Sequence, residues 1–127
     1  MTIYLTPSIS DEQIEQLETY DAYKYGVELL ESRFPRDAAR VLRRVVDDSP
    51  ENPEGWELLG RAYFASALLG PAEEAFRRLI DLEPTNAWAH TALGLALSRQ
   101  GRHAEGDEFH RIADALGGDG SRATFVG

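Results

Sequence analysis

The sequence between residues 53 and 86 places bulky and small side chains at intervals that bring them onto one face of a helix. Trp56, Leu59, Gly60 and Tyr63 follow one another at steps of three, one and three residues. Residues at these steps form a single stripe along an α-helix. Because glycine has no side chain, a second backbone can approach closely beside it. We therefore expect a helix that packs tightly against a neighbour.

A second helix follows within the same stretch. Ala72 and Phe76 lie four residues apart on its apolar side. Pro71 precedes them at the beginning of this helix, where proline is tolerated, and Gly70 ends the first helix. Pro84 cannot continue the second helix, so the chain turns there. The stretch therefore predicts a unit of two helices joined by a short turn.

The pattern recurs on both sides of this unit at a distance of 34 residues. Gly60 corresponds to Gly26 and Gly94, so the small position is kept in every unit. The outer units match less closely, because the third one has His90 in the place of Trp56. We divide the chain into a lead-in, three repeats and a tail, at residues 1–18, 19–52, 53–86, 87–118 and 119–127.

The unit resembles the tetratricopeptide repeat. The resemblance rests on Trp56, Leu59-Gly60, Tyr63, Ala72, Phe76 and Pro84. It implies an all-α fold, a right-handed α-solenoid of three helix-turn-helix repeats with an N-terminal helical extension. Residues 1–127 would then form a single domain, with a flexible tail. Three units are about the smallest stable stack of this kind.

One position departs from the regular repeat. Ala67 occupies the place where the first helix of such a unit usually ends in glycine, and the next glycine is Gly70. We therefore expect the first helix of the central unit to continue for one more turn, and the second helix to begin later.

The N-terminal part of the chain predicts one long helix. No glycine or proline lies between Asp11 and Gly26, so we expect a continuous helix from Asp11 to about Arg33. Ser10 and Gln13 have the spacing of a capping box at its start. Residues 1–9 are expected to be extended.

The net charge of −9 argues against partners that need a basic surface. Nucleic acids and anionic membranes are therefore not expected partners. The chain has no cysteine and no apolar run long enough to span a membrane. The first ten residues lack the basic segment and long apolar run of a signal peptide, so we do not expect one. We expect a cytoplasmic protein. Four arginines of the first repeat are expected on the solvated side of its second helix, namely Arg36, Arg40, Arg43 and Arg44.

Candidate catalytic chemistry is sparse. His103, Asp107 and His110 share one helix face, a spacing that could bind a metal. The stronger interpretation is that His110 packs between helices, since it corresponds to Phe76. No phosphate-binding loop or nucleophile motif is present. We expect neither an enzyme nor a bound metal or cofactor.

The first helices of such repeats line a concave groove, and the resemblance implies that partners bind there. We expect Tyr23, Arg61 and Phe64 to face the groove, whereas Leu30, Trp88 and Leu95 are equally compatible with packing between repeats. The groove positions are Tyr20, Tyr23, Val27, Leu30, Glu31, Glu54, Glu57, Arg61, Phe64, Ala65, Trp88, Thr91, Leu95, Ser98 and Arg99.

These positions predict a protein-interaction module. Aromatic residues and arginine carry binding energy most often, and a basic, apolar peptide would complement the acidic chain. Only Arg61 and Arg99 are cationic, so the groove lacks the Lys, Asn and Arg set of repeats that clamp a carboxylate terminus. Two alternatives remain open: a small chaperone of a secreted or complexed client, and a self-assembling structural subunit.

The C-terminal repeat has no capping helix after it. The second helix of this repeat carries Phe109 and Ile112 in addition to the expected inward residues, so some apolar surface should be left over. The cover could be a partner, Phe125 and Val126 of the tail, or a second copy of the chain. We favour a weak symmetric homodimer.

Overall fold

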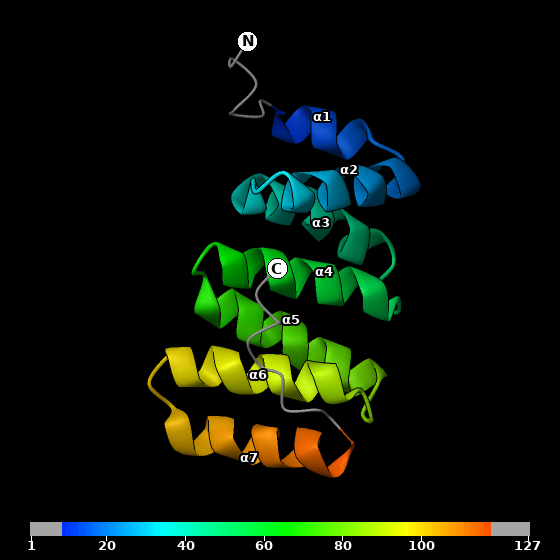
Figure 1. Cartoon of the computed structure of the whole chain (residues 1–127). Helices are drawn as coiled ribbons and strands as arrows, with labels where there is room; N and C mark the ends of the chain where they lie inside the picture. Colours follow the sequence, from blue (N-terminus) through cyan, green and yellow to red (C-terminus); the bar gives the residue numbers. More distant parts are fainter. Residues whose placement is uncertain (1–8, 118–127) are drawn as a thin grey trace.

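The computed structural model describes residues 9–117, which form seven α-helices stacked one above the next (Figure 1). No strand occurs in this part of the chain, so the expected all-α class is confirmed. The expectations for residues 1–8 and for the tail, including Phe125 and Val126, lie outside the described residues. The helices are α1 (Asp11–Gln16), α2 (Thr19–Glu31), α3 (Pro35–Asp48), α4 (Pro53–Ala65), α5 (Leu69–Leu82), α6 (Ala87–Arg99) and α7 (His103–Ala115).

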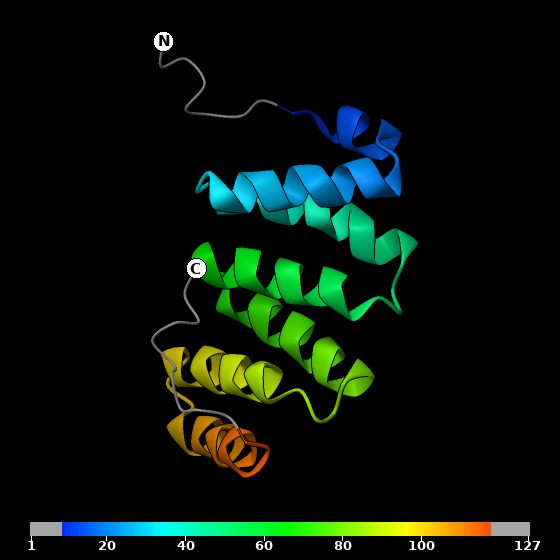
Figure 2. The same ribbon diagram turned by 45° about the vertical axis from the view of Figure 1, so that its right-hand side comes forward.

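Three helix pairs follow one another along the stack: α2 with α3, α4 with α5, and α6 with α7 (Figure 2). One apolar cluster extends over the first part of the stack, from Ile14 to Ala62. A second cluster extends over the later part, from Phe64 to Leu97. Tyr63 packs against both clusters, so the core is continuous along the stack.

Each pair has the same close contact at a glycine of its first helix. A Cβ atom built on any of the three glycines would overlap a side chain from the second helix of the pair. Only a residue without a Cβ allows the helices to pack this closely. The contacts are Gly26 with Leu42, Gly60 with Phe76, and Gly94 with His110. The contact of Gly94 confirms that His110 packs between helices, as the correspondence with Phe76 predicted.

Two repeats are joined to the preceding one by the same hydrogen bond. Trp56 is half-buried, and its indole N–H donates to the carbonyl oxygen of Pro50 at 2.8 Å. His90 lies 34 positions later, and its Nε2 is 2.8 Å from the carbonyl oxygen of Pro84. The carbonyl can only accept, so the proton is on Nε2 of the imidazole. The histidine thus makes the same hydrogen bond as the tryptophan at the equivalent position.

The single helix expected from Asp11 to Arg33 is wrong. Helix α1 ends at Gln16, and the next two residues, Leu17 and Glu18, have extended backbones with ψ of 141° and 151°. The chain bends there because α1 packs across α3 instead of continuing into α2. Tertiary packing overrides the local helical preference. The capping box of Ser10 at the start of α1 is confirmed.

Two arginines of α3 hold α1 in this position. The guanidinium of Arg44 donates to the carbonyl oxygens of Ile14 and Glu15 at 2.7 and 2.6 Å. Arg40 donates to the carbonyl oxygen of Ile9 and forms an ion pair of 2.8 Å with Asp11. The Ile14 carbonyl also accepts from the backbone N–H of Leu17 at 3.1 Å, so Arg44 adds a second donor there and supplies one for Glu15, whose carbonyl is at the end of the helix. The arginines expected only on a solvated face therefore include two that fasten α1.

The expected extension of the first helix in the central repeat is also wrong. Helix α4 ends at Ala65, and Ala67 adopts the left-handed conformation with φ of 62°. Arg33 and Gly101, at the same position of the other repeats, have φ of 67° and 84°. The repeat turn therefore dictates this conformation even without glycine, and Gly70 lies inside α5.

Replacing Ala67 with glycine should raise the free energy of unfolding by about 0.5–1 kcal/mol. The left-handed conformation costs an L-residue about 1–2 kcal/mol, and the greater freedom of glycine in the unfolded chain offsets about 0.4–1 kcal/mol of this gain. Urea denaturation measures the change. The reverse substitution at the equivalent position, Gly101→Ala, should destabilise the protein. A less stable Ala67→Gly variant would contradict this account of the turn.

The C-terminal helix leaves apolar side chains exposed, as expected. Ile112 is 40% exposed and Leu116 is 38% exposed. Leu82, which corresponds to Leu116 within the stack, is also 38% exposed. The exposure of Leu116 is therefore a property of the repeat. The additional exposed apolar side chain at the end of the stack is that of Ile112.

Candidate functional site

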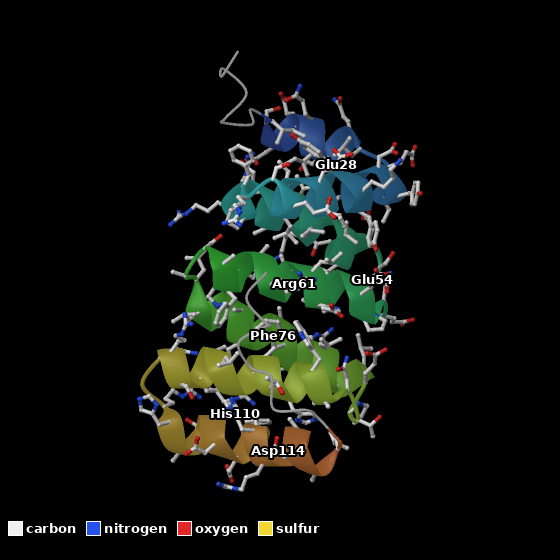
Figure 3. The ribbon with its side chains drawn as sticks, viewed as in Figure 1. Glu28, Glu54, Arg61, Phe76, His110 and Asp114 are labelled. Atoms are coloured by element: carbon white, nitrogen blue, oxygen red, sulfur yellow. The ribbon has the colours of Figure 1, made fainter. Side chains whose placement is uncertain are left out.

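The predicted groove residues come from the first helix of each pair, α2, α4 and α6. Their exposure varies widely, so they cannot all contribute equally to a binding surface. Figure 3 shows Glu54 near the start of α4 and Arg61 midway along that helix. Tyr20, Glu31, Glu54, Ala65 and Arg99 are exposed; Tyr23, Val27, Leu30, Glu57, Arg61, Trp88, Thr91, Leu95 and Ser98 are half-buried; and Phe64 is buried.

Helices α2 and α4 are connected across the repeat boundary by two of these residues. The hydroxyl group of Tyr23 donates a hydrogen bond to the carboxylate of Glu54. This bond, together with partial burial and the negative charge of Glu54, raises the pKa of Tyr23 to about 12. The phenol is therefore neutral at physiological pH and holds the Glu54 carboxylate in place.

Glu57 lies on the same helix, one turn after Glu54. Its half-buried position raises the pKa of its carboxyl group, because burial disfavours the charged form. Arg61 opposes this shift from a distance of 3.9 Å, at the outer limit of an ion pair. Glu54 and Glu83 reinforce the shift by repulsion. The start of α4 therefore concentrates negative charge that its neighbouring arginine only partly balances.

Phe64 does not face solvent, contrary to the expectation from its position. Its side chain is 6% exposed and belongs to the second core cluster. The guanidinium of Arg99, from α6, lies over the ring at 5.1 Å from its centroid. Phe64 therefore supports the junction of the second and third repeats, and Arg99 is the member of this pair that solvent and partners can reach.

Trp88 also has a packing role. Its ring meets the ring of Phe76 edge-on, with 5.8 Å between the centroids, and it belongs to the margin of the second core cluster. Leu30 and Leu95 are likewise packed against the core clusters. Among the five exposed positions of the candidate surface, the large side chains are those of Tyr20, Glu31, Glu54 and Arg99.

One neighbour of this surface was missed from the sequence. The ammonium group of Lys24 lies over the ring of Tyr20 at 5.4 Å from its centroid, an attractive cation–π contact. The spacing of four residues on one helix was the available signal, because such residues lie on the same face.

The histidines do not form a metal centre. Within residues 9–117, no three His, Asp or Glu side chains are placed together so that they could hold a metal ion. His103 is exposed at the start of α7, whereas His110 lies between α6 and α7 (Figure 3). The two side chains therefore belong to different environments of the helix.

Titration of Tyr23 should reveal its contact with Glu54. The raised pKa, about 12 against an ordinary 10.0, means that the contact stabilises the fold fully below pH 10 and is lost as the pH rises toward 12. Ultraviolet absorbance of the phenolates against pH measures this step. Tyr23→Phe should remove the most alkaline step, whereas Tyr20→Phe should retain it. A curve unchanged by Tyr23→Phe would contradict the contact.

Comparison with known sequences identifies the class of protein. A sequence profile described as tetratricopeptide repeat matches residues 23–87, and a second profile with this description matches residues 75–108. The first match alone covers more than half of the 127 residues. The chain belongs to the tetratricopeptide repeat family. It is therefore a repeat module of the kind that generally serves as a protein-interaction scaffold.

Solved structures of MamA are similar to this fold. A point variant of MamA aligns with a TM-score of 0.77 and 20% identity, over 84% of this chain and 79% of that chain. MamA from Desulfovibrio magneticus aligns with a TM-score of 0.76 and 27% identity, over 84% of this chain and 61% of that chain. This chain thus spans less than two thirds of the latter structure, and the likeness is one of repeat architecture.

Two further observations bound the comparison. No curated protein sequence matches the chain significantly. Among the described helices, none has the length and apolar character that crossing a membrane requires.

Proposed function

We propose that the chain binds a protein or peptide along the face formed by α2, α4 and α6, through apolar and basic groups of that partner. The exposure of Tyr20 carries this proposal. Its side chain is 68% exposed, more than any other large apolar side chain in the described part of the chain. Tyrosine is among the residues that most often carry binding energy at protein contacts.

The charge of the chain indicates the chemistry of the partner. The net charge is −9, and Glu54 and Glu57 add negative charge close to Tyr23. A partner with basic residues would be attracted to this surface and oriented by it. Arg61 and Arg99 add positively charged side chains at other points of the same face. The partner would therefore be recognised by both negative and positive groups.

Affinity capture from the native cell extract tests this proposal. The face variant carries Tyr20→Ala and Glu54→Gln, which remove an exposed ring of α2 and an exposed negative charge of α4. The control carries Arg36→Ala and Arg111→Ala, which remove exposed side chains of α3 and α7. A partner retained by wild type and control should fall about tenfold with the face variant, as expected for loss of about 1.4 kcal/mol. Equal capture by the face variant would refute the proposed surface.

Self-association is a second candidate function, and the exposure of Ile112 favours it. An apolar side chain at the open end of a stack can be buried by a symmetric contact with a second copy. Sedimentation from low to high micromolar concentration should then show a weak dimer for wild type and a monomer for Ile112→Glu. A wild-type protein that remains monomeric over this range would exclude the homodimer.

A further inference from the structure

We propose that the junction of α2 and α4 binds one arginine side chain of the partner. Two tyrosines of α2 and two glutamates of α4 form this Tyr–Glu surface, namely Tyr20, Tyr23, Glu54 and Glu57. The inference rests on the proposed function, because it assigns one contact within the face that would bind the partner. It adds the chemical identity of the partner group and the place where that group lies.

The aromatic side of the Tyr–Glu surface already interacts with a cation. The ammonium group of Lys24 lies 5.4 Å from the centroid of the Tyr20 ring. The residue as a whole is 68% exposed, so it remains accessible to solvent beside Lys24. A guanidinium group is planar and can lie flat on such a ring, which an ammonium group cannot do. Arginine can therefore contact the exposed ring over a larger area than lysine can.

The acidic side of the surface is held in position across the repeat boundary. Tyr23 donates its hydroxyl proton to Glu54, and it also lies within electrostatic range of Glu57 and Tyr20. A carboxylate has two oxygens and accepts several hydrogen bonds, so the bond from Tyr23 leaves Glu54 able to accept more. Tyr23 thus links Tyr20, one turn earlier on α2, to the two carboxylates of α4.

Glu57 gives the surface its preference for a cation. Burial and the negative charges of Glu54 and Glu83 oppose ionisation of Glu57. The guanidinium group of Arg61 favours ionisation, but at 3.9 Å it lies at the outer limit of an ion pair. A guanidinium group beside Glu54 and Glu57 would reduce this repulsion. Its five N–H donors match carboxylate oxygens, and charge-assisted hydrogen bonds of this kind are stronger than neutral ones.

Helix α7 offers an acidic surface for comparison, with exposed Glu105, Asp107 and Glu108. Glu105 is paired with Arg102 at 2.7 Å, and the half-buried ring of Phe109 lies under Arg77, so α7 has acidic groups but no exposed phenyl, phenol or indole ring. If negative charge alone attracted arginine, α7 should bind it as well as the Tyr–Glu surface does. The comparison therefore separates a defined contact from general attraction to an acidic protein.

A nuclear magnetic resonance titration tests the inference without a natural partner. The probes are N-acetyl-arginine amide and the neutral N-acetyl-citrulline amide, which has nearly the same shape. The arginine probe should shift the backbone amides of Tyr20, Tyr23, Glu54 and Glu57 along one saturable curve. Citrulline should bind about fivefold more weakly, since it loses the cation–π and carboxylate attraction.

Three variants locate the contact. Tyr20→Leu and Glu57→Gln should each weaken the binding of the arginine probe, whereas Glu108→Gln on α7 should leave it unchanged. Equal shifts with arginine and citrulline would overturn the inference. Shifts on α7 as large as those on the Tyr–Glu surface would also overturn it.

The titration and the affinity capture can fail independently. Arginine binding at the Tyr–Glu surface, combined with full capture of the partner by the face variant, would show a surface that binds arginine but that the partner does not use, and would refute the proposed function together with the partner contact inferred from it. Loss of the partner with the face variant, combined with no arginine binding, would support the proposed function and refute this inference.

Discussion

Replacing Phe76 with alanine should lower the free energy of unfolding by about 3–5 kcal/mol. Phe76 is fully buried, fills the space over Gly60 and contacts the ring of Trp88. A domain of this size has only about 5–15 kcal/mol of stability in total, so the loss is severe. Urea denaturation followed by circular dichroism measures it.

The control for this substitution lies on the same helix. Leu82 is 38% exposed at the end of α5, so Leu82→Ala should cost less than about 1 kcal/mol. Similar losses from Phe76→Ala and Leu82→Ala would show that the contact between Phe76 and Gly60 does not determine the packing of the central repeat.

Adding a single methyl group at Gly60 should also destabilise the fold, by about 1–3 kcal/mol. A Cβ atom at Gly60 would overlap the ring of Phe76, so the helices must separate or the ring must move. Gly70 provides the control, because a Cβ built there meets nothing within 4 Å apart from its chain neighbours. Gly70→Ala gains helix propensity but brings the methyl group against the ring of the following Pro71, so its effect should be smaller than that of Gly60→Ala.

A double variant tests whether the two residues act through their contact. In Gly60→Ala with Phe76→Ala, the added methyl group no longer meets a ring and fills part of the space that the ring leaves. The double variant should therefore lose less stability than the sum of the single variants. Additive losses would contradict a direct steric contact between Gly60 and Phe76.

The repeat helices could be predicted from the sequence because their signals recur at a fixed interval. Gly26, Gly60 and Gly94 mark the same contact in each repeat, and the structure confirms the contact each time. The break after Gln16 could not be predicted in this way, because the lead-in has no counterpart in the repeats. Its cause is the packing of α1 on α3, about 30 residues later in the chain.

The candidate surface was predictable only as a set of positions. The interval of 34 residues places Phe64 and Arg99 on corresponding helices, but it does not show that Arg99 covers the ring. The hydrogen bond from Tyr23 to Glu54 likewise depends on how two successive repeats meet. The exposure and pairing of these side chains therefore depend on how neighbouring repeats meet. A sequence pattern within one repeat gives no information about that contact.

The way in which α1 is fastened affects how freely its sequence can diverge. Arg40 and Arg44 bind main-chain carbonyl oxygens, which every amino acid provides whatever its side chain. Ile14 is the single buried side chain of this helix. Mutations can therefore accumulate at most positions of α1 without detaching it, provided that Ile14 and the two arginines are retained. Sequence divergence should be tolerated in the helix that caps the stack and restricted in the helix beneath it.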